Sequence, residues 1–153
     1  MFKPADTLTA MTKGFSPNRL NLQSKGVAKI LGDAEAKIVT ILWERGPLTV
    51  RDVLTELKEQ NHPLSFNATM TILNRLVEKD VLSKQHSGRG RGVFRYAPVA
   101  DRATFLERMT KEMFRRVFRD DELFSVAGFA DAIDELPDEE RKKLTQLLRK
   151  KQR

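Results

Sequence analysis

Apolar side chains recur at helical spacing in three segments of the first part of the chain. These segments, 32–45, 50–60 and 66–79, have apolar residues three and four positions apart, which predicts three amphipathic helices. Thr49 and Ser65 are suitable N-caps for the second and third helices. The pattern therefore predicts a small helical domain with one buried stripe on each helix.

The pattern changes after the third helix. Two β-strands are predicted at 81–86 and 92–97, where Val93, Phe94 and Tyr96 are residues that favour strands, and the chain turns between them at Ser87–Arg91. The turn reads SGRGR, so Arg89 and Arg91 lie at a glycine-rich tip. Three helices followed by a basic hairpin is the order of elements in a winged helix-turn-helix.

Three further helices are predicted after Pro98, at 101–119, at 121–135 and from Pro137 onward. They carry more large apolar side chains than roughly 55 residues can bury against one another. We therefore expect a second copy of the chain to cover them. The expected dimerisation residues are Phe105, Met109, Met113, Phe114, Val117, Phe124, Phe129, Leu144, Leu147 and Leu148.

These elements predict a mainly α fold with a small β-hairpin wing. We expect a basic N-terminal arm at 1–29, a winged helix-turn-helix domain at 30–99 and a helical dimerisation region at 100–153. The arm is polar and shows no sustained period, so disorder or loose packing is expected there.

Charge points to a class of partner. The chain of 153 residues has a formal net charge of +7. Residues 1–30 hold five basic residues against one acid, and residues 81–96 hold four basic residues and no acid. Two such foci favour a polyanion such as DNA, although basic runs are also common on surfaces that only contact solvent.

Composition removes several function classes. The chain has no cysteine, which excludes disulfides and thiolate metal sites. His62 and His86 do not lie at metal-ligand spacing, and no nucleotide-binding or hydrolase motif occurs. No apolar run approaches the roughly 20 residues of a membrane-spanning helix. We expect a cytoplasmic protein with no enzymatic activity, no cofactor, no metal and no membrane partner.

The outer face of the predicted helix 66–79 is suited to a DNA major groove, where amide, hydroxyl and apolar groups read base edges. The expected base-reading residues are Asn67, Met70, Thr71 and Asn74. Phosphate contacts position a protein on DNA without reading sequence. The expected backbone contacts are Ser65, Arg75, Lys84, Arg89, Arg91 and Arg95.

Plainer alternatives remain for these residues. Asn67 and Asn74 suit an ordinary solvated helix surface, and Arg75 suits an ion pair within the chain. Phe94 and Tyr96 are expected to pack in the wing and not to stack on bases. A winged helix also serves as a protein-interaction module without specific DNA binding, which is the main alternative function. A ligand cavity among the Met- and Phe-rich C-terminal helices is a further alternative, which core packing explains better.

Three stretches resemble the penicillinase-repressor family, the BlaI/MecI/CopY group. They are LGDAEAKIVTILWERGPLTVRDVLTEL, TMTILNRLVEKDVL and GRGRGVFRYAPV, and they cover about residues 30–100. The resemblance implies a bacterial homodimeric repressor whose winged helices bind a palindromic operator and whose C-terminal helices dimerise.

The chain departs from the family pattern at three points. It lacks the C-terminal cysteines of the copper-responsive branch and the Asn-Phe bond that is cleaved in the β-lactam branch. An unidentified inducer or protease is therefore the expected signal. Asp80 replaces the glycine usual after the recognition helix, which we expect to alter the turn and not the function.

Overall fold

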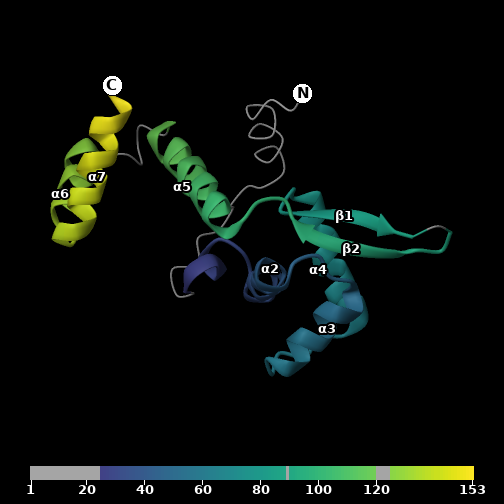
Figure 1. Ribbon diagram of the computed structural model, residues 1–153. Helices are drawn as coiled ribbons and strands as arrows, with labels where there is room; N and C mark the ends of the chain where they lie inside the picture. The colour runs from purple at the N-terminus through teal and green to yellow at the C-terminus, as the bar shows by residue number, and fades with distance from the viewer. Residues whose placement is uncertain (1–24, 89, 120–124) are drawn as a thin grey trace. The chain divides into compact units, whose positions relative to one another are not determined.

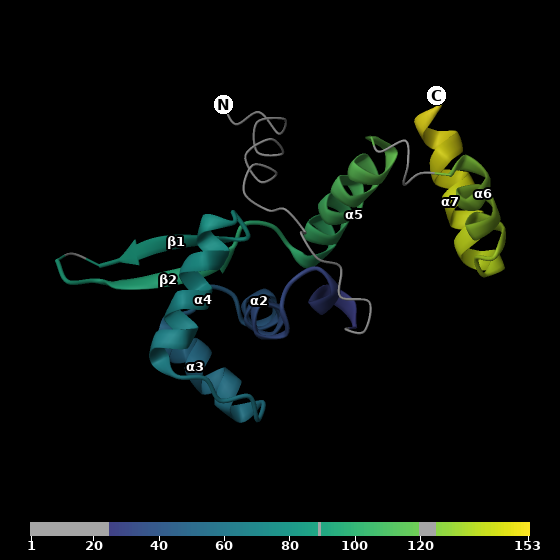
Figure 2. The same ribbon diagram turned by 180° about the vertical axis from the view of Figure 1, so that it is seen from behind.

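The computed structural model describes residues 25–88, 90–119 and 125–153. The chain divides into two compact units, residues 1–112 and 113–153, which we describe separately (Figures 1 and 2). Most of the predicted arm, together with Arg89 and Phe124, lies outside the described residues. Within them, no helix combines the length and the apolarity needed to cross a membrane.

Three α-helices form the body of the first unit. They are α2 (Asp33–Arg45), α3 (Val50–Glu59) and α4 (Phe66–Glu78), and they confirm the predicted ranges to within one residue at each end. A short 3₁₀-helix, η1 (Gly26–Lys29), precedes them. Its Val27 is buried in the core of this unit.

The helix starts follow from their capping side chains. Thr49 Oγ1 accepts from the Asp52 N–H at 3.2 Å, and Asp52 Oδ2 accepts from the Thr49 N–H at 2.9 Å, so the predicted N-cap forms part of a capping box. The backbone N–H and then the hydroxyl of Thr49 hold the pKa of Asp52 below its ordinary value, with a smaller effect from Arg95. Ser65 Oγ accepts from the Ala68 N–H at 3.1 Å and caps α4.

The hairpin consists of β1 (Leu82–Ser87) and β2 (Val93–Pro98), paired antiparallel from Leu82 opposite Pro98 to Ser87 opposite Val93. Both strands begin one residue later than predicted. Gly92 belongs to the turn and not to the second strand, and a side chain at this position would collide with the Ser87 carbonyl oxygen and with His86. Leu48 pairs with Tyr96 on the other edge of β2 and ties the hairpin to the helices.

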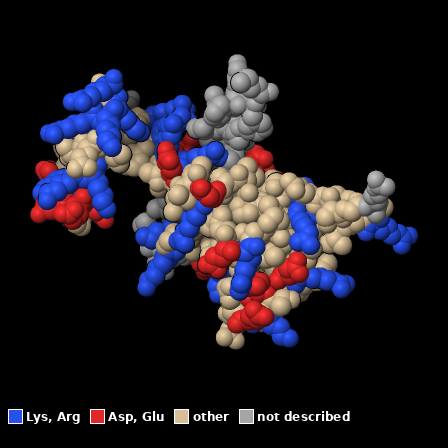
Figure 3. All heavy atoms as spheres, viewed as in Figure 1, with Lys and Arg blue, Asp and Glu red and all other residues tan. Residues whose placement is uncertain are grey.

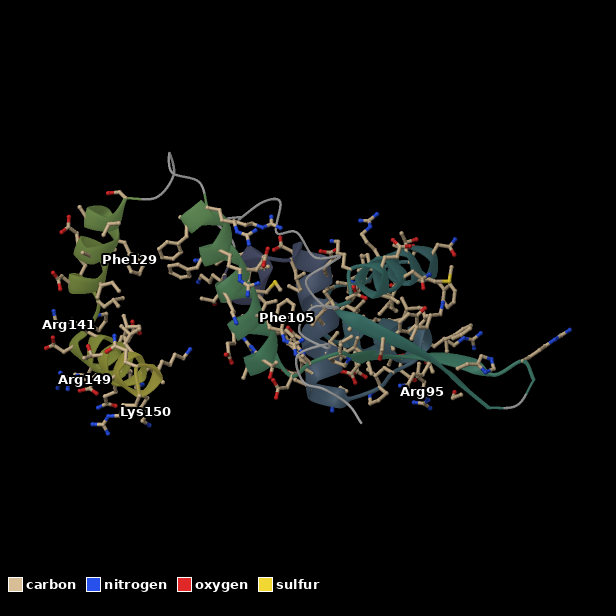
Figure 4. All side chains as sticks on the ribbon, turned by 90° about the horizontal axis from the view of Figure 1, so that it is seen from above. Arg95, Phe105, Phe129, Arg141, Arg149 and Lys150 are labelled. Carbon is tan, nitrogen blue, oxygen red and sulfur yellow. The ribbon has the colours of Figure 1, made fainter. Side chains whose placement is uncertain are left out.

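The core of the first unit also receives two residues that were expected at a dimer interface. Phe105 and Met109, on α5 (Arg102–Arg119), are 2% and 4% exposed. The Phe105 ring centroid lies 5.4 Å from that of Trp43, whose indole N–H donates to the Ala100 carbonyl at 2.9 Å (Figure 4). Burial within one chain leaves this pair little surface for a second copy, because helical periodicity shows that a side is buried but not what covers it.

The second unit contains the end of α5 and two helices, α6 (Val126–Asp134) and α7 (Asp138–Lys151). Ser125 caps α6, and the start predicted at residue 121 lies outside the described residues. Pro137 is the N-cap of α7 and not its first helical residue, as its extended ψ of 142° requires. None of the described residues of this unit is buried.

Asp80 ends α4 in the left-handed conformation, with φ of 57°. The Asp80 N–H donates to Val77 O at 3.0 Å and the Val81 N–H to Leu76 O at 2.9 Å, which is a Schellman motif.

A β-carbon costs roughly 1–2 kcal/mol in this conformation, and aspartate bears it better than alanine does. We expect Asp80→Ala to lower the free energy of unfolding by about 1 kcal/mol and Asp80→Gly not to lower it. Urea denaturation of the three proteins would check this order, and an alanine variant as stable as the glycine variant would contradict it.

Candidate nucleic-acid interface

The exposed side of α4 is uncharged from its start to Arg75. Asn67, Met70 and Thr71 face solvent, whereas Thr69 and Leu73 on the opposite side are buried. Met70 is 38% exposed, as a residue expected on the outer side of this helix should be. This surface offers an amide, a thioether and a hydroxyl, which are groups suited to base edges in a major groove.

The start of α4 is suited to an anion. No acidic side chain lies in its first turn, so nothing there neutralises the positive end of the helix dipole. The Ser65 hydroxyl accepts from Ala68 and keeps its own hydrogen for donation. Backbone N–H groups and hydroxyls at such a helix start are frequent ligands of phosphate oxygens.

Asn74 lies on α4 and is half-buried on the side of the helix that contacts the hairpin. Its Oδ1 accepts from the Tyr96 hydroxyl at 3.0 Å and from Lys84 Nζ at 3.1 Å. Asn74 was expected to read bases and Lys84 to contact phosphate. The structure gives both residues a role inside the chain, because with Tyr96 they join the hairpin to the proposed recognition helix.

The two faces of the hairpin differ. Lys84 and Tyr96 are opposite one another and share the face toward α4 with Phe94, whose ring centroid lies 4.3 Å from Lys84 Nζ. Arg95 lies on the other face and donates to the Pro47 carbonyl at 3.3 Å (Figure 4). The cations expected to contact the DNA backbone are therefore divided between both faces.

The end of the hairpin is basic. Gly88 and Gly90 have φ of 104° and 79°, conformations that favour glycine and allow the tight turn. Arg91 is exposed there, and the neighbouring Arg89 lies outside the described residues. In Figure 3 a blue side chain marks the end of the hairpin, while the red side chains of this unit lie over its helical part. Arg75, in the last turn of α4, is also exposed.

The second unit presents an apolar surface. Phe114 lies with its ring centroid 5.7 Å from those of Phe118 and Phe129, and the three rings form one cluster. Met113 and Leu144 are half-buried. The remaining described residues predicted for dimerisation, which are Phe114, Val117, Phe129, Leu147 and Leu148, are each at least 37% exposed.

Sequence reasoning missed the link between Asn74 and Tyr96. The alternation of Phe94 and Tyr96 shows that both point to one face, but the pairing with α4 depends on how the hairpin packs. Tyrosine is also a residue that needs a partner for its hydroxyl when it is buried, and Tyr96 is 1% exposed. A tyrosine expected to pack in the wing was therefore the one feature of the sequence that indicated a hydrogen-bond partner for its hydroxyl.

Tyr96→Phe tests this link. The variant keeps the ring and removes the hydroxyl that donates to Asn74, so we expect the free energy of unfolding to fall by about 0.5–1.5 kcal/mol. Urea denaturation measures the loss. Lys84→Met removes the other donor to the Asn74 amide oxygen and tests the same link a second time. If neither variant is less stable than the parent, the link contributes nothing to the free energy of unfolding.

Nothing in the described residues suggests chemistry at this surface. No group of three His, Asp or Glu side chains in that part of the chain is arranged to hold a metal ion. Its features are those of a binding surface. Neutral hydrogen-bonding groups lie on a helix, and Lys and Arg side chains lie on the hairpin beside it.

Comparison with known proteins identifies a family. The family model described as penicillinase repressor matches residues 31–150. No curated protein matches the chain. The solved DNA-binding domain of the repressor BlaI is 28% identical, with 52% of this chain and 92% of that one covered and a TM-score of 0.41.

Two longer chains are similar at lower identity. Bordetella bronchiseptica BpsR, solved in a study of how 6-hydroxynicotinic acid regulates its DNA binding, is 16% identical over 97% of this chain and 92% of its own, with a TM-score of 0.43. Lactococcus lactis ZitR is 16% identical over 94% and 90%, with a TM-score of 0.42. The family match spans both the winged helix and the C-terminal helices, and this protein therefore belongs to the penicillinase-repressor family of DNA-binding transcriptional regulators, which are not enzymes.

Proposed function

We propose that this regulator is a homodimeric repressor that binds a palindromic operator, with α4 in the major groove and the hairpin on the backbone or in the minor groove. One observation carries the DNA part of the proposal. The exposed side of α4 is neutral and rich in hydrogen-bonding groups, while the hairpin beside it holds cations and no acid. This is the division of labour expected between base reading and backbone contact.

Residue roles follow from position. Asn67, Met70 and Thr71 are proposed to reach base edges, and Ser65 and Arg75 to bind phosphates at the two ends of α4. Arg89 and Arg91 at the hairpin tip are proposed as further backbone contacts. Asn74, Lys84 and Arg95 have partners within the chain, so their proposed share in DNA binding is secondary.

The dimer part of the proposal rests on the second unit. Its described residues include large exposed apolar side chains and none that is buried, so a single copy gives this unit no core of its own. Burial against a second copy would remove that surface from water. Two winged helices related by a two-fold axis would then present their α4 helices about 34–36 Å apart, which is one turn of DNA.

We place DNA binding in residues 30–99 and dimerisation in the residues after about 110. The first half of α5 packs into the first unit through Phe105 and Met109, and it thereby links the two functions in one continuous helix. A regulator of this kind acts on chromosomal DNA, so we place it in the bacterial cytoplasm.

Substitutions in α4 and in the hairpin should have different effects. We expect Asn67→Ala and Thr71→Ala each to reduce discrimination between operator and random DNA by roughly 1–3 kcal/mol, because each removes a base contact. The double variant Arg89→Ala, Arg91→Ala should bind both duplexes less tightly, by about the same factor. Its affinity should also depend less on salt, because phosphate contacts release counterions. Fluorescence anisotropy with both duplexes at two salt concentrations measures these effects.

Thr55→Ala is the matched control for Thr71→Ala. Thr55 is an exposed helical threonine on α3, and its loss should leave DNA binding unchanged. If the α4 variants lose the same amount of affinity for operator and for random DNA, the assigned base-reading roles are refuted. Absence of any preferred duplex would instead favour the protein-interaction module.

A further inference from the structure

A pocket of about 530 Å³ opens on the first unit, away from the proposed DNA-reading helix. It lies among η1, the outer side of α2, the loop after α3 and the first residue of α5. Its volume is within the range of roughly 300–1,000 Å³ found for small-molecule sites. Residues 25–40, the loop at 60–62 and Arg102 are distant from one another in sequence, so the pocket depends on the folded unit.

The pocket has an apolar floor and a cationic rim. Val27 and Ala36 contribute almost wholly buried side chains to its lining. Lys25, Lys37 and Arg102 line it from three different elements. Asp33 is the one carboxylate among the described lining residues, so positive charge prevails there.

Polar hydrogen-bonding groups complete the lining. Thr40, Gln60 and His62 supply a hydroxyl, an amide and an imidazole at the side of the pocket formed by α2 and the loop after α3. Small-molecule sites commonly pair an apolar floor with a few polar groups that fix orientation. A ligand that suits this lining has an apolar body and an anionic group.

We propose that this pocket binds a small carboxylate with an apolar, ring-sized body. The carboxylate would lie against Lys37 and Arg102, and the ring would lie over Ala28 and the exposed edges of Val27 and Ala36. The chain's own N-terminal arm is a poorer occupant, because residues 1–24 hold three basic residues and one acid and would bring like charge to the rim.

The site is distinct from the proposed DNA interface. On α2 the lining residues Asp33, Ala36, Lys37 and Thr40 recur three and four positions apart and share one side. Glu35 points to the opposite side of the same helix, where its carboxylate pairs with Lys79 at the end of α4 at 2.9 Å. Binding in the pocket is therefore measurable without DNA and does not depend on the function proposed above.

The test is a titration of the isotope-labelled full chain with benzoate, followed by amide resonances. Benzoate should shift the amides of residues 26–28, 33–40 and 102 in a saturable way. Benzylamine, which has the same ring and the opposite charge, should not. In the Lys37→Glu, Arg102→Glu double variant the dissociation constant for benzoate should rise by about tenfold or more, since two charge-assisted contacts are lost.

A charge-matched control separates the site from the general surface. Lys58→Glu with Lys111→Glu makes the same change in net charge at exposed positions outside the pocket, and should bind benzoate as the parent does. Benzoate shifts confined to the Phe114–Phe129 cluster, equal binding of benzylamine, or an unchanged constant in the pocket variant would each overturn the proposal. So would occupation by the arm, seen as broadening of the pocket amides by a nitroxide attached at Thr9→Cys, which would be the single cysteine of the chain.

Discussion

Leu147→Glu is expected to convert the protein from a dimer to a monomer. Leu147 lies on α7 beside Leu148, and both are more than half exposed in a single chain. Full burial of an exposed leucine contributes about 1.5–3 kcal/mol, so roughly half of that is available at Leu147, and a two-fold interface contains the residue twice. Loss of about 1.5–3 kcal/mol would raise the dimer dissociation constant by roughly 10–10²-fold, before the cost of burying a carboxylate is added.

Gln146→Glu is the matched control for this change. Gln146 precedes Leu147 on the same helix, and the period of 3.6 residues places it away from the leucines, on the side that carries Arg149 and Lys150. Sedimentation velocity over a concentration series compares the two variants directly. The proposed interface is wrong if Leu147→Glu dimerises as tightly as Gln146→Glu does.

Phe105→Ala is expected to lower the free energy of unfolding of the first unit by about 3–5 kcal/mol. The ring is 2% exposed and packs on Trp43, so its removal leaves a cavity in the core that holds α5 against α2. A loss of this size is a large part of the 5–15 kcal/mol that stabilises a typical domain. Urea denaturation followed by the fluorescence of Trp43, the single tryptophan, reports on this unit.

Phe118→Ala makes the same chemical change at an exposed position of the second unit. Phe118 is 48% exposed in one chain, and its truncation should affect dimerisation and leave the first unit as stable as in the parent. If Phe105 belonged to the dimer interface, both variants would alter the dimer constant alike and neither would destabilise the domain. The pair thus separates a core residue from an interface residue on one helix.

The winged helix was predictable because local chemistry determines most of it. Thr49 and Ser65 cap their helices as the sequence indicates, and Gly46, with φ of 85°, ends α2. Capping and amphipathic period act within a few residues, so a single sequence contains that information. The same holds for the hairpin, whose strands begin one residue later than predicted.

The tertiary contacts were not predictable in this way. Phe105 and Phe114 both belong to the apolar pattern of α5, yet one is buried in the first unit and the other is exposed in the second. Asn74 lies on the outward side of α4 by periodicity, and only the packing of the hairpin brings Tyr96 and Lys84 to its amide oxygen. Period identifies which side of a helix is apolar, but it does not identify the partner.

The most direct test of DNA recognition is binding of the purified protein to the region upstream of its own gene, compared with a random duplex of equal length at two salt concentrations. A sequence-specific dimeric repressor should prefer the upstream duplex, protect about two helical turns of it, and lose affinity steeply as salt rises. Equal binding to both duplexes that disappears at the higher salt concentration would contradict specific recognition and leave only a basic surface.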